Sequence, residues 1–219
     1  LETPSPQLAK LEAAVSKEST ELLSAVGNAL DANAKSPSAN TLAGTLKSIE
    51  TRWQKNESDT QKLILGKVTQ QVSHAANSIL QYIENQEANG PFTQFWKKAF
   101  SGTREKQRQS MAQDVRAAVE GLNSATNVLL DVPAGTAPNE AQLKAYHDAL
   151  AHLMNDTGFD LLFEYGQQAM GENEVLSQQM STVAGIGAAV ASGGLLSLLA
   201  LPQLGTMALV AAASGAATA

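Results

Sequence analysis

One group of titratable side chains that could do chemistry is His147, Asp148 and His152, which lie within six residues. On a helix the two imidazoles would point about 140° apart, so a single metal ion cannot easily take both. Asp148 and His152 are four residues apart on one face, and we expect a solvated contact between them. No HExxH pattern supports zinc chemistry. We therefore predict no metal site.

Three carboxylates, Glu164, Glu172 and Glu174, precede the charge-free end of the chain. As a catalytic pair they would have to converge across elements, which no local spacing indicates. We interpret them as a solubilising turn, with an acid-sensitive trigger as the functional alternative, because neutral carboxyls enter a membrane at lower cost. The absence of cysteine excludes thiol chemistry. Neither a serine-nucleophile motif nor a phosphate-binding glycine loop occurs, so we predict no catalytic residues and no cofactor.

The distribution of charge is the most unusual feature of the sequence. The chain has 219 residues, 15 basic and 21 acidic, with a net charge of −6, which argues against a general nucleic-acid binder. The last charged residue is Glu174, and none follows from Val175 to Ala219. A helix on the surface of a soluble protein normally carries charge on its outer face. We therefore expect this segment to be buried in protein or inserted in lipid, with a flexible tail as the third alternative.

Residues 183–219 read as an apolar hairpin. The first arm, Val183 to Leu201, has the 19 residues that a helix needs to span a bilayer. Pro202-Gln203 separates it from a second apolar run, and its glycines and alanines suit close helix packing. We expect a hairpin that is masked in a soluble state and released at a membrane. The residues expected to contact the membrane or partner are Leu195, Leu196, Leu198 and Leu199.

A second candidate for membrane contact follows Asn89-Gly90-Pro91 and combines aromatic with basic side chains. Such a composition is typical of an interfacial anchor on anionic lipid. The alternative is that the aromatic residues plug the end of a helical bundle, while the basic residues begin an exposed helix. The residues concerned are Phe92, Phe95, Trp96, Lys97, Lys98, Phe100, Arg104, Lys106 and Arg108.

The elements that must position these segments are helical throughout. Apolar residues recur at three- and four-residue spacings, and no strand alternation is present. We predict a first helix from Pro6 to Ser36, then one of about 47 residues that Asn40 or Thr41 caps and Asn89-Gly90 ends. Asn56 and Thr60, polar residues in its apolar seam, either fix register or mark a missing partner helix. Further helices are expected at 103–130 and after the cap Asn139.

These long helices, rich in Ala, Gln and Ser, resemble two bacterial groups in overall layout when taken together with the uncharged hairpin. One comprises secreted effectors and translocators of specialised secretion systems, and the other the α-helical pore-forming toxins. The resemblance covers layout only and transfers no residues. It implies a non-enzymatic virulence protein that is secreted from a bacterium and associates with the host-cell membrane.

We therefore predict an all-α, elongated bundle of five to seven helices, with residues 1–182 as the bundle and 183–219 as the apolar hairpin. We expect both ends to be cut from a longer protein. The expected partners are an anionic membrane or partner helices, a homo-oligomer is left open, and nucleic acid is excluded. Two alternatives stay open: a soluble interaction or scaffold domain with the hairpin as its core, and a fragment of an enzyme whose active site is not readable.

Overall fold

The computed structural model describes residues 5–85 and 104–159, and these residues form helices joined by short turns, with no strand among them. This confirms the all-α class. The predicted hairpin at 183–219 and the aromatic residues from Phe92 to Phe100 lie outside the described residues. The described helices are α1 (Pro6–Lys35), α2 (Ala39–Asn85), α4 (Arg104–Leu130) and α5 (Glu140–Asn155).

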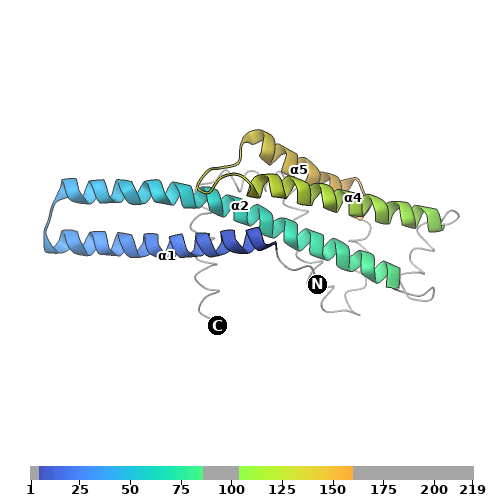
Figure 1. The fold of residues 1–219 in the computed structure, drawn as a ribbon, viewed down its shortest axis with the longest axis horizontal. Coiled ribbons are helices and arrows are strands. Elements are labelled where there is room, and N and C mark those ends of the chain that lie inside the picture. The colour runs from blue at the N-terminus through green and yellow to red at the C-terminus, as the bar shows by residue number, and fades with distance from the viewer. Residues whose placement is uncertain (1–4, 86–103, 160–219) are drawn as a thin grey trace.

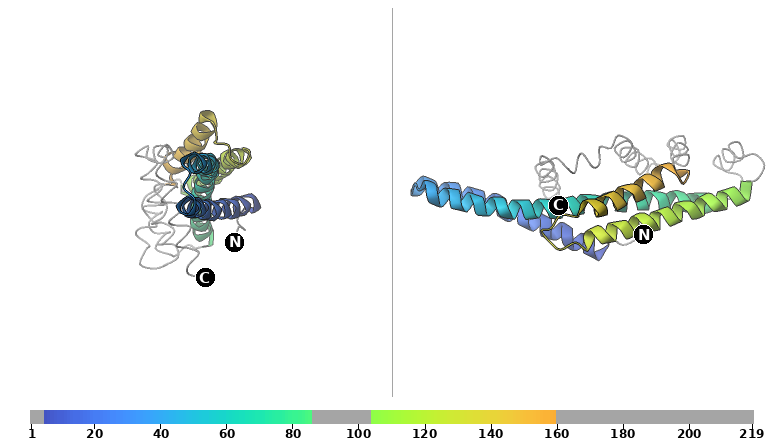
Figure 2. Two further views of the ribbon diagram at one scale, coloured as in Figure 1. Left: turned by 90° about the vertical axis from the view of Figure 1, so that its left-hand side faces the viewer. Right: turned by 90° about the horizontal axis from the view of Figure 1, so that it is seen from above.

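Helix α2, with 47 residues, contacts both α1 and α4. Its first part pairs with α1 as an antiparallel hairpin, and its second part packs against α4, which in turn packs against α5 (Figure 1). The four helices run close to one long axis, and α4 and α5 leave the turn end of the α1–α2 pair uncovered (Figures 1 and 2). Two neighbouring stretches of one helix therefore have different packing environments.

Local sequence signals explain where the helices begin and end. Pro6 stands in the first turn of α1, where its missing N–H costs nothing. Ser36-Pro37-Ser38 ends α1, and the Ser38 hydroxyl accepts from the Thr41 N–H at 3.4 Å, so Ser38 caps α2 rather than the expected Asn40 or Thr41. Asn139 caps α5 as predicted, through a capping box with Gln142.

The main hydrophobic core lies between the second part of α2, α4 and α5. Most apolar residues that recur at three- and four-residue spacing in α4 and α5 are buried there, and Met111, Ala125 and Leu143 are half-buried at its edge. Leu8, Val15 and Leu22 bury a separate stripe of α1 against α2. The fully buried large side chains of the main core include Leu65, Val72, Leu122, Leu129, Tyr146, Leu150, Leu153 and Phe159.

Charged pairs on the surface set the register of α1 against α2. Arg52 grips Glu18 through two bonds of 2.8 and 2.9 Å and reaches Glu21 at 3.1 Å. These carboxylates raise the pKa of Arg52. Further along the same two helices, Lys67 of α2 pairs with Glu12 of α1 at 2.7 Å. Both pairs join residues more than 30 positions apart, so they favour one alignment of the hairpin over its slipped alternatives.

A buried cation anchors the loop between α4 and α5. Lys62 Nζ donates to the carbonyl oxygens of Val132 and Pro133 at 3.2 and 3.0 Å and pairs with Asp59 at 2.8 Å. Its side chain is 2% exposed, and three acceptors match the three protons of an ammonium group. Asp59 also accepts from the Gly135 N–H at 2.8 Å. Gly135 has φ +73°, and a β-carbon at this position would lie 3.1 Å from Lys55 Cβ, so this turn favours glycine.

Candidate functional site

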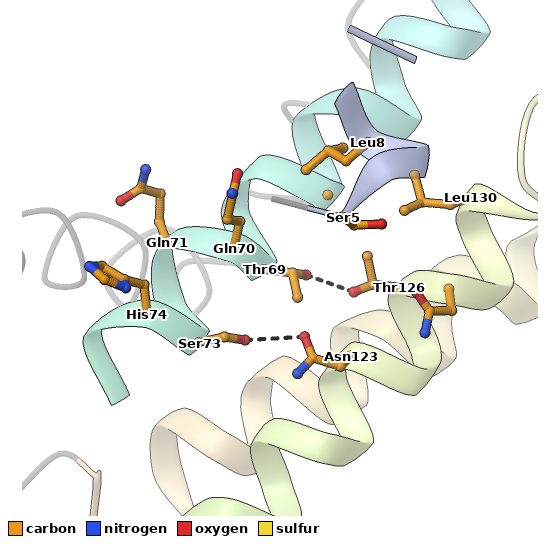
Figure 3. Close-up of a pocket in the computed structure, with 12 residues that line it drawn as sticks. Ser5, Leu8, Thr69, Gln70, Gln71, Ser73, His74, Asn123, Thr126 and Leu130 are labelled. Carbon is orange, nitrogen blue, oxygen red and sulfur yellow. Dashed lines mark hydrogen bonds between the residues drawn. The ribbon is translucent and has the colours of Figure 1, made fainter. Parts of the chain in front are cut away.

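An open groove of about 720 Å³ lies where α1 begins, between α2 and α4. Ser5 and Leu8 close one end, and Thr69 and Ser73 of α2 face Thr126 and Asn123 of α4 across it (Figure 3). Helix α1 starts at Pro6, and its buried Leu8 lies against Gly66 of α2. The groove therefore lies beside the first turn of α1.

The floor of the groove is a small network of hydroxyl groups. Thr69 Oγ1 lies 2.7 Å from Thr126 Oγ1, and Ser73 Oγ donates to Asn123 Oδ1 at 3.2 Å (Figure 3). Thr126 Oγ1 also donates to the Leu122 carbonyl at 2.8 Å. All three hydroxyl residues are buried, and buried polar groups need partners to avoid a desolvation cost. The three hydroxyl groups of the floor therefore have hydrogen-bond partners within the protein and need none from a ligand.

Tyr146 of α5 supports this floor from the core side. Its hydroxyl donates to the Leu65 carbonyl at 3.1 Å and lies within hydrogen-bond distance of Thr69 Oγ1, at 3.2 Å. Each hydroxyl carries one proton. Thr126 donates its hydroxyl proton to the Leu122 carbonyl. The Thr69 hydroxyl therefore donates to one of its two neighbours, Thr126 or Tyr146. Burial raises the pKa of Tyr146 to about 12, against the lowering effect of the Thr69 hydrogen bond.

The rim of the groove is polar but uncharged. Gln71, His74 and Asn127 are exposed there, with Gln70 and Asn123 half-buried beside them. None of the described lining residues is Asp, Glu, Lys or Arg. Carboxamides and hydroxyls offer both donors and acceptors. The arrangement suits an uncharged segment with small side chains, and it gives a strongly charged ligand no counter-charge.

The histidine group of the sequence is a set of ordinary surface contacts. His152 Nδ1 lies 3.1 Å from Asp156 Oδ2, so its partner is Asp156 and the expected contact with Asp148 is wrong. Asp148 pairs with Lys144, whose hydrogen bond is the main reason that the pKa of Asp148 is lowered. His147 Nδ1 lies 3.7 Å from Asp148 Oδ1. Within residues 5–85 and 104–159, no three His, Asp or Glu side chains gather as a metal site.

The residues predicted to contact a membrane are mostly outside the described ranges. Phe92, Phe95, Trp96, Lys97, Lys98 and Phe100 precede α4, and Leu195, Leu196, Leu198 and Leu199 follow α5. Arg104, Lys106 and Arg108 belong to the first turns of α4. Of the described helices, none is both long and apolar enough to cross a bilayer.

The sequence interpretation missed the groove. Its signal was present as small polar residues beside the apolar seam, at four-residue spacing in Thr69 and Ser73 of α2. Such residues are also common on a solvated helix face. They form the floor of a groove only because Thr126 and Asn123 of α4 hydrogen-bond to them.

Comparisons with protein-family models, with curated proteins and with solved structures found no match. The function is therefore argued from the residues and their geometry.

Proposed function

We propose that this chain is a non-enzymatic helical scaffold that brings an uncharged segment to a membrane surface. The observation that carries the proposal is the charge boundary at Glu174: every charged side chain lies at or before it, and the following 45 residues carry none. A segment of this composition gains free energy by leaving water for an apolar environment, whether lipid or protein. In the proposed mechanism the helices before the boundary keep the protein soluble and hold the segment ready.

The described helices suit the scaffold part of this role. Interhelical ion pairs fix α1 on α2, and the buried Lys62 fixes the α4–α5 loop on α2. These contacts involve Arg52, Lys62 and Lys67 in the middle of α2, and they hold its neighbours in place while an attached segment changes environment. The basic residues Arg104, Lys106 and Arg108 at the start of α4 would draw the body towards anionic lipid.

The test is flotation of the full chain with anionic and neutral vesicles at pH 7 and pH 5. We expect flotation with anionic vesicles, stronger at pH 5, because Glu164, Glu172 and Glu174 lose charge as the pH falls. The Leu196→Asp/Leu199→Asp variant should lose at least tenfold in bound fraction. Val128→Asp is the matched control, since Val128 is a large apolar residue, 51% exposed on α4, and should float like the parent.

Two results would contradict the membrane proposal. One is the absence of flotation in all four conditions. The other is equal flotation of the parent and the Leu196→Asp/Leu199→Asp variant, which would separate membrane binding from the apolar run.

A second function, that of a soluble helical interaction domain, is favoured by the groove. The groove is uncharged, lies between two helices and has about 720 Å³ of room. An uncharged helix rich in Gly and Ala has the matching chemistry, because small side chains allow close helix approach. In this case the uncharged segment of the chain packs as core and the groove receives it.

Photocrosslinking separates this second function from the first. A benzophenone amino acid replaces Asn127 at the groove rim in the full chain, and the matched control replaces Gln113, which is exposed elsewhere on α4. Crosslinks from position 127 to peptides of residues 175–219, well above those from position 113, would support the packed state. Equal and low crosslinking from both positions would exclude it.

A further inference from the structure

The groove between α2 and α4 is about as long as two turns of a helix. On α2 its lining residues begin at Gly66 and end at His74, which is nine residues or about 13 Å of helix. On α4 they begin at Asn123 and end at Leu130, which is eight residues. One short helical stretch that lies along both walls would therefore fill the groove, and a longer helix would extend beyond it.

The floor of the groove favours an occupant whose side chains form no hydrogen bonds. The hydroxyl groups of Thr69, Ser73 and Thr126 already have partners within the protein. Apolar atoms that cover them therefore leave no buried hydroxyl without a partner. A charged ligand would meet no opposite charge, because none of the described lining residues carries one. The groove is thus suited to a stretch of small, uncharged side chains.

One stretch of the uncharged segment matches the groove in length and in side-chain size. Gly187 to Gly194 has eight residues, and all of them except Val190 are Gly, Ala or Ser. Side chains of this size let a helix approach its neighbours closely. The stretch lies inside Val183 to Leu201, the run that is long enough to span a bilayer. The candidate occupant of the groove is therefore part of the candidate for membrane insertion.

The stretch is close enough along the chain to reach the groove. The described residues end at Phe159, and Gly158 lies so near α4 that a β-carbon on it would be 3.0 Å from the Met111 sulfur. Met111 is twelve residues, or about 18 Å of helix, from Asn123 at the edge of the groove. Residues 160–186 would extend about 40 Å even at the short rise of a helix, which exceeds this separation. Binding to the groove is then intramolecular, so it does not weaken when the protein is dilute.

We propose that Gly187 to Gly194 occupies the groove and thereby holds Val183 to Leu201 away from membranes. This inference rests on both proposed functions, because it makes them two states of the same segment. A run whose middle lies between α2 and α4 cannot enter a bilayer at the same time. The apparent affinity for a membrane is then lowered to the extent that the groove is occupied.

Filling the groove with another side chain is the first test. Asn127 is exposed at the rim, so Asn127→Trp should take up room in the groove without disturbing the core. If about one molecule in ten has an empty groove, freeing the stretch raises the apparent affinity for anionic vesicles about tenfold. Gln113→Trp adds the same side chain at an exposed position elsewhere on α4 and should float like the parent. An Asn127→Trp variant that floats no better than Gln113→Trp would overturn the proposal.

An engineered disulfide tests the occupied state directly, since the chain has no cysteine of its own. Asn127→Cys, in the middle of the α4 wall, is combined with a second cysteine substitution at one of the four consecutive positions 188–191, in the middle of the stretch. Four consecutive positions sample every face of a helix. We expect a disulfide in at least one of the four pairs, loss of flotation with anionic vesicles in its oxidised form, and recovery after reduction. Gln113→Cys with the same four partners is the control and should form no disulfide.

The outcomes separate this inference from the functions on which it rests. Pairs that float when reduced but form no disulfide, or that float equally when oxidised, would show that the groove does not hold this stretch. Disulfides that form as readily with Gln113→Cys would show the same. Benzophenone crosslinks from position 127 that map to residues 204–219 would overturn the choice of Gly187 to Gly194. Pairs that do not float even when reduced would overturn the membrane proposal together with this inference.

Discussion

Leu8 of α1 lies against Gly66 of α2 so closely that its Cδ1 is 2.5 Å from where a β-carbon on Gly66 would stand. Leu8 is buried, and this contact is where α1 begins its path along α2. It also forms one end of the groove. A glycine inside a long helix costs about 1 kcal/mol relative to alanine, and here it allows the first turn of α1 to lie directly on α2.

Gly66→Ala should therefore destabilise the protein, although alanine is the better helix former. The buried Leu8 side chain must shift, at a cost that we expect to exceed the propensity gain by about 1 kcal/mol. In a Leu8→Ala background the same substitution should stabilise by about 1 kcal/mol, because only the propensity gain remains. Urea unfolding of the four chains in this double-mutant cycle measures the change of sign. The same sign in both backgrounds would disprove the steric explanation.

Lys62→Met should cost about 3 kcal/mol, because it leaves Asp59 and two loop carbonyls without their buried cation. Lys47→Met, at an exposed position of α2, is the control and should be near neutral. Adding Asp59→Asn to Lys62→Met should recover part of the loss, since the uncompensated charge is removed. Denaturant unfolding reports all three, and a cost below 1 kcal/mol for Lys62→Met would show that the anchor is dispensable.

Tyr146→Phe should cost about 1 kcal/mol at pH 7 through the lost hydrogen bond to Leu65. It should also change the response to alkali. The folded pKa of Tyr146 is raised to about 12 from an ordinary value of 10, so between these values the unfolded chain loses a proton that the folded protein keeps. Tyr146 therefore lowers the unfolding free energy by up to about 1.4 kcal/mol per pH unit in that window.

The unfolding free energies of the parent and of Tyr146→Phe should accordingly converge above pH 10 and cross before pH 12, because a loss of about 1.4 kcal/mol per pH unit exceeds the difference of about 1 kcal/mol at pH 7. The effect is absent below pH 10, where both states hold the proton. Parallel curves for the two chains across this window would show that Tyr146 titrates in the folded protein as it does in water.

Ser19 and Asn56 form a buried polar contact in the α1–α2 seam, with Asn56 Nδ2 donating to Ser19 Oγ at 2.9 Å. Ser19→Ala alone should cost about 1 kcal/mol, because it leaves the Asn56 amide buried without this partner. The Ser19→Ala/Asn56→Leu pair should restore or exceed the parent stability. Thermal unfolding of the single and double variants tests this. A double variant less stable than Ser19→Ala would indicate that the contact contributes more than its own desolvation cost.

Asn56 illustrates what the local spacing of apolar residues can and cannot predict about the packing of a helix. Its place in the apolar seam predicts either a register-fixing contact or a missing partner helix, and the structure supplies a contact with Ser19. Closer to the start of α2, the seam has the character expected where a partner helix is missing, because Leu46 is exposed and Trp53 only half-buried. One helix has both environments because α1 accompanies only its first part, while α4 packs on its second part.

The sequence by itself determined the all-α class, the stop at Ser36-Pro37-Ser38 and the capping box at Asn139, because backbone geometry and hydrogen bonds within a few residues decide these features. The tertiary structure alone decided the groove, the buried Lys62 and the turn end of the α1–α2 pair that α4 and α5 leave uncovered. Each depends on which residues meet across separate helices, as Lys62 meets Pro133 from 71 positions away and Thr69 meets Thr126 from 57. Periodicity shows which face of a helix is apolar, but the partner that covers this face is set by packing over the whole chain.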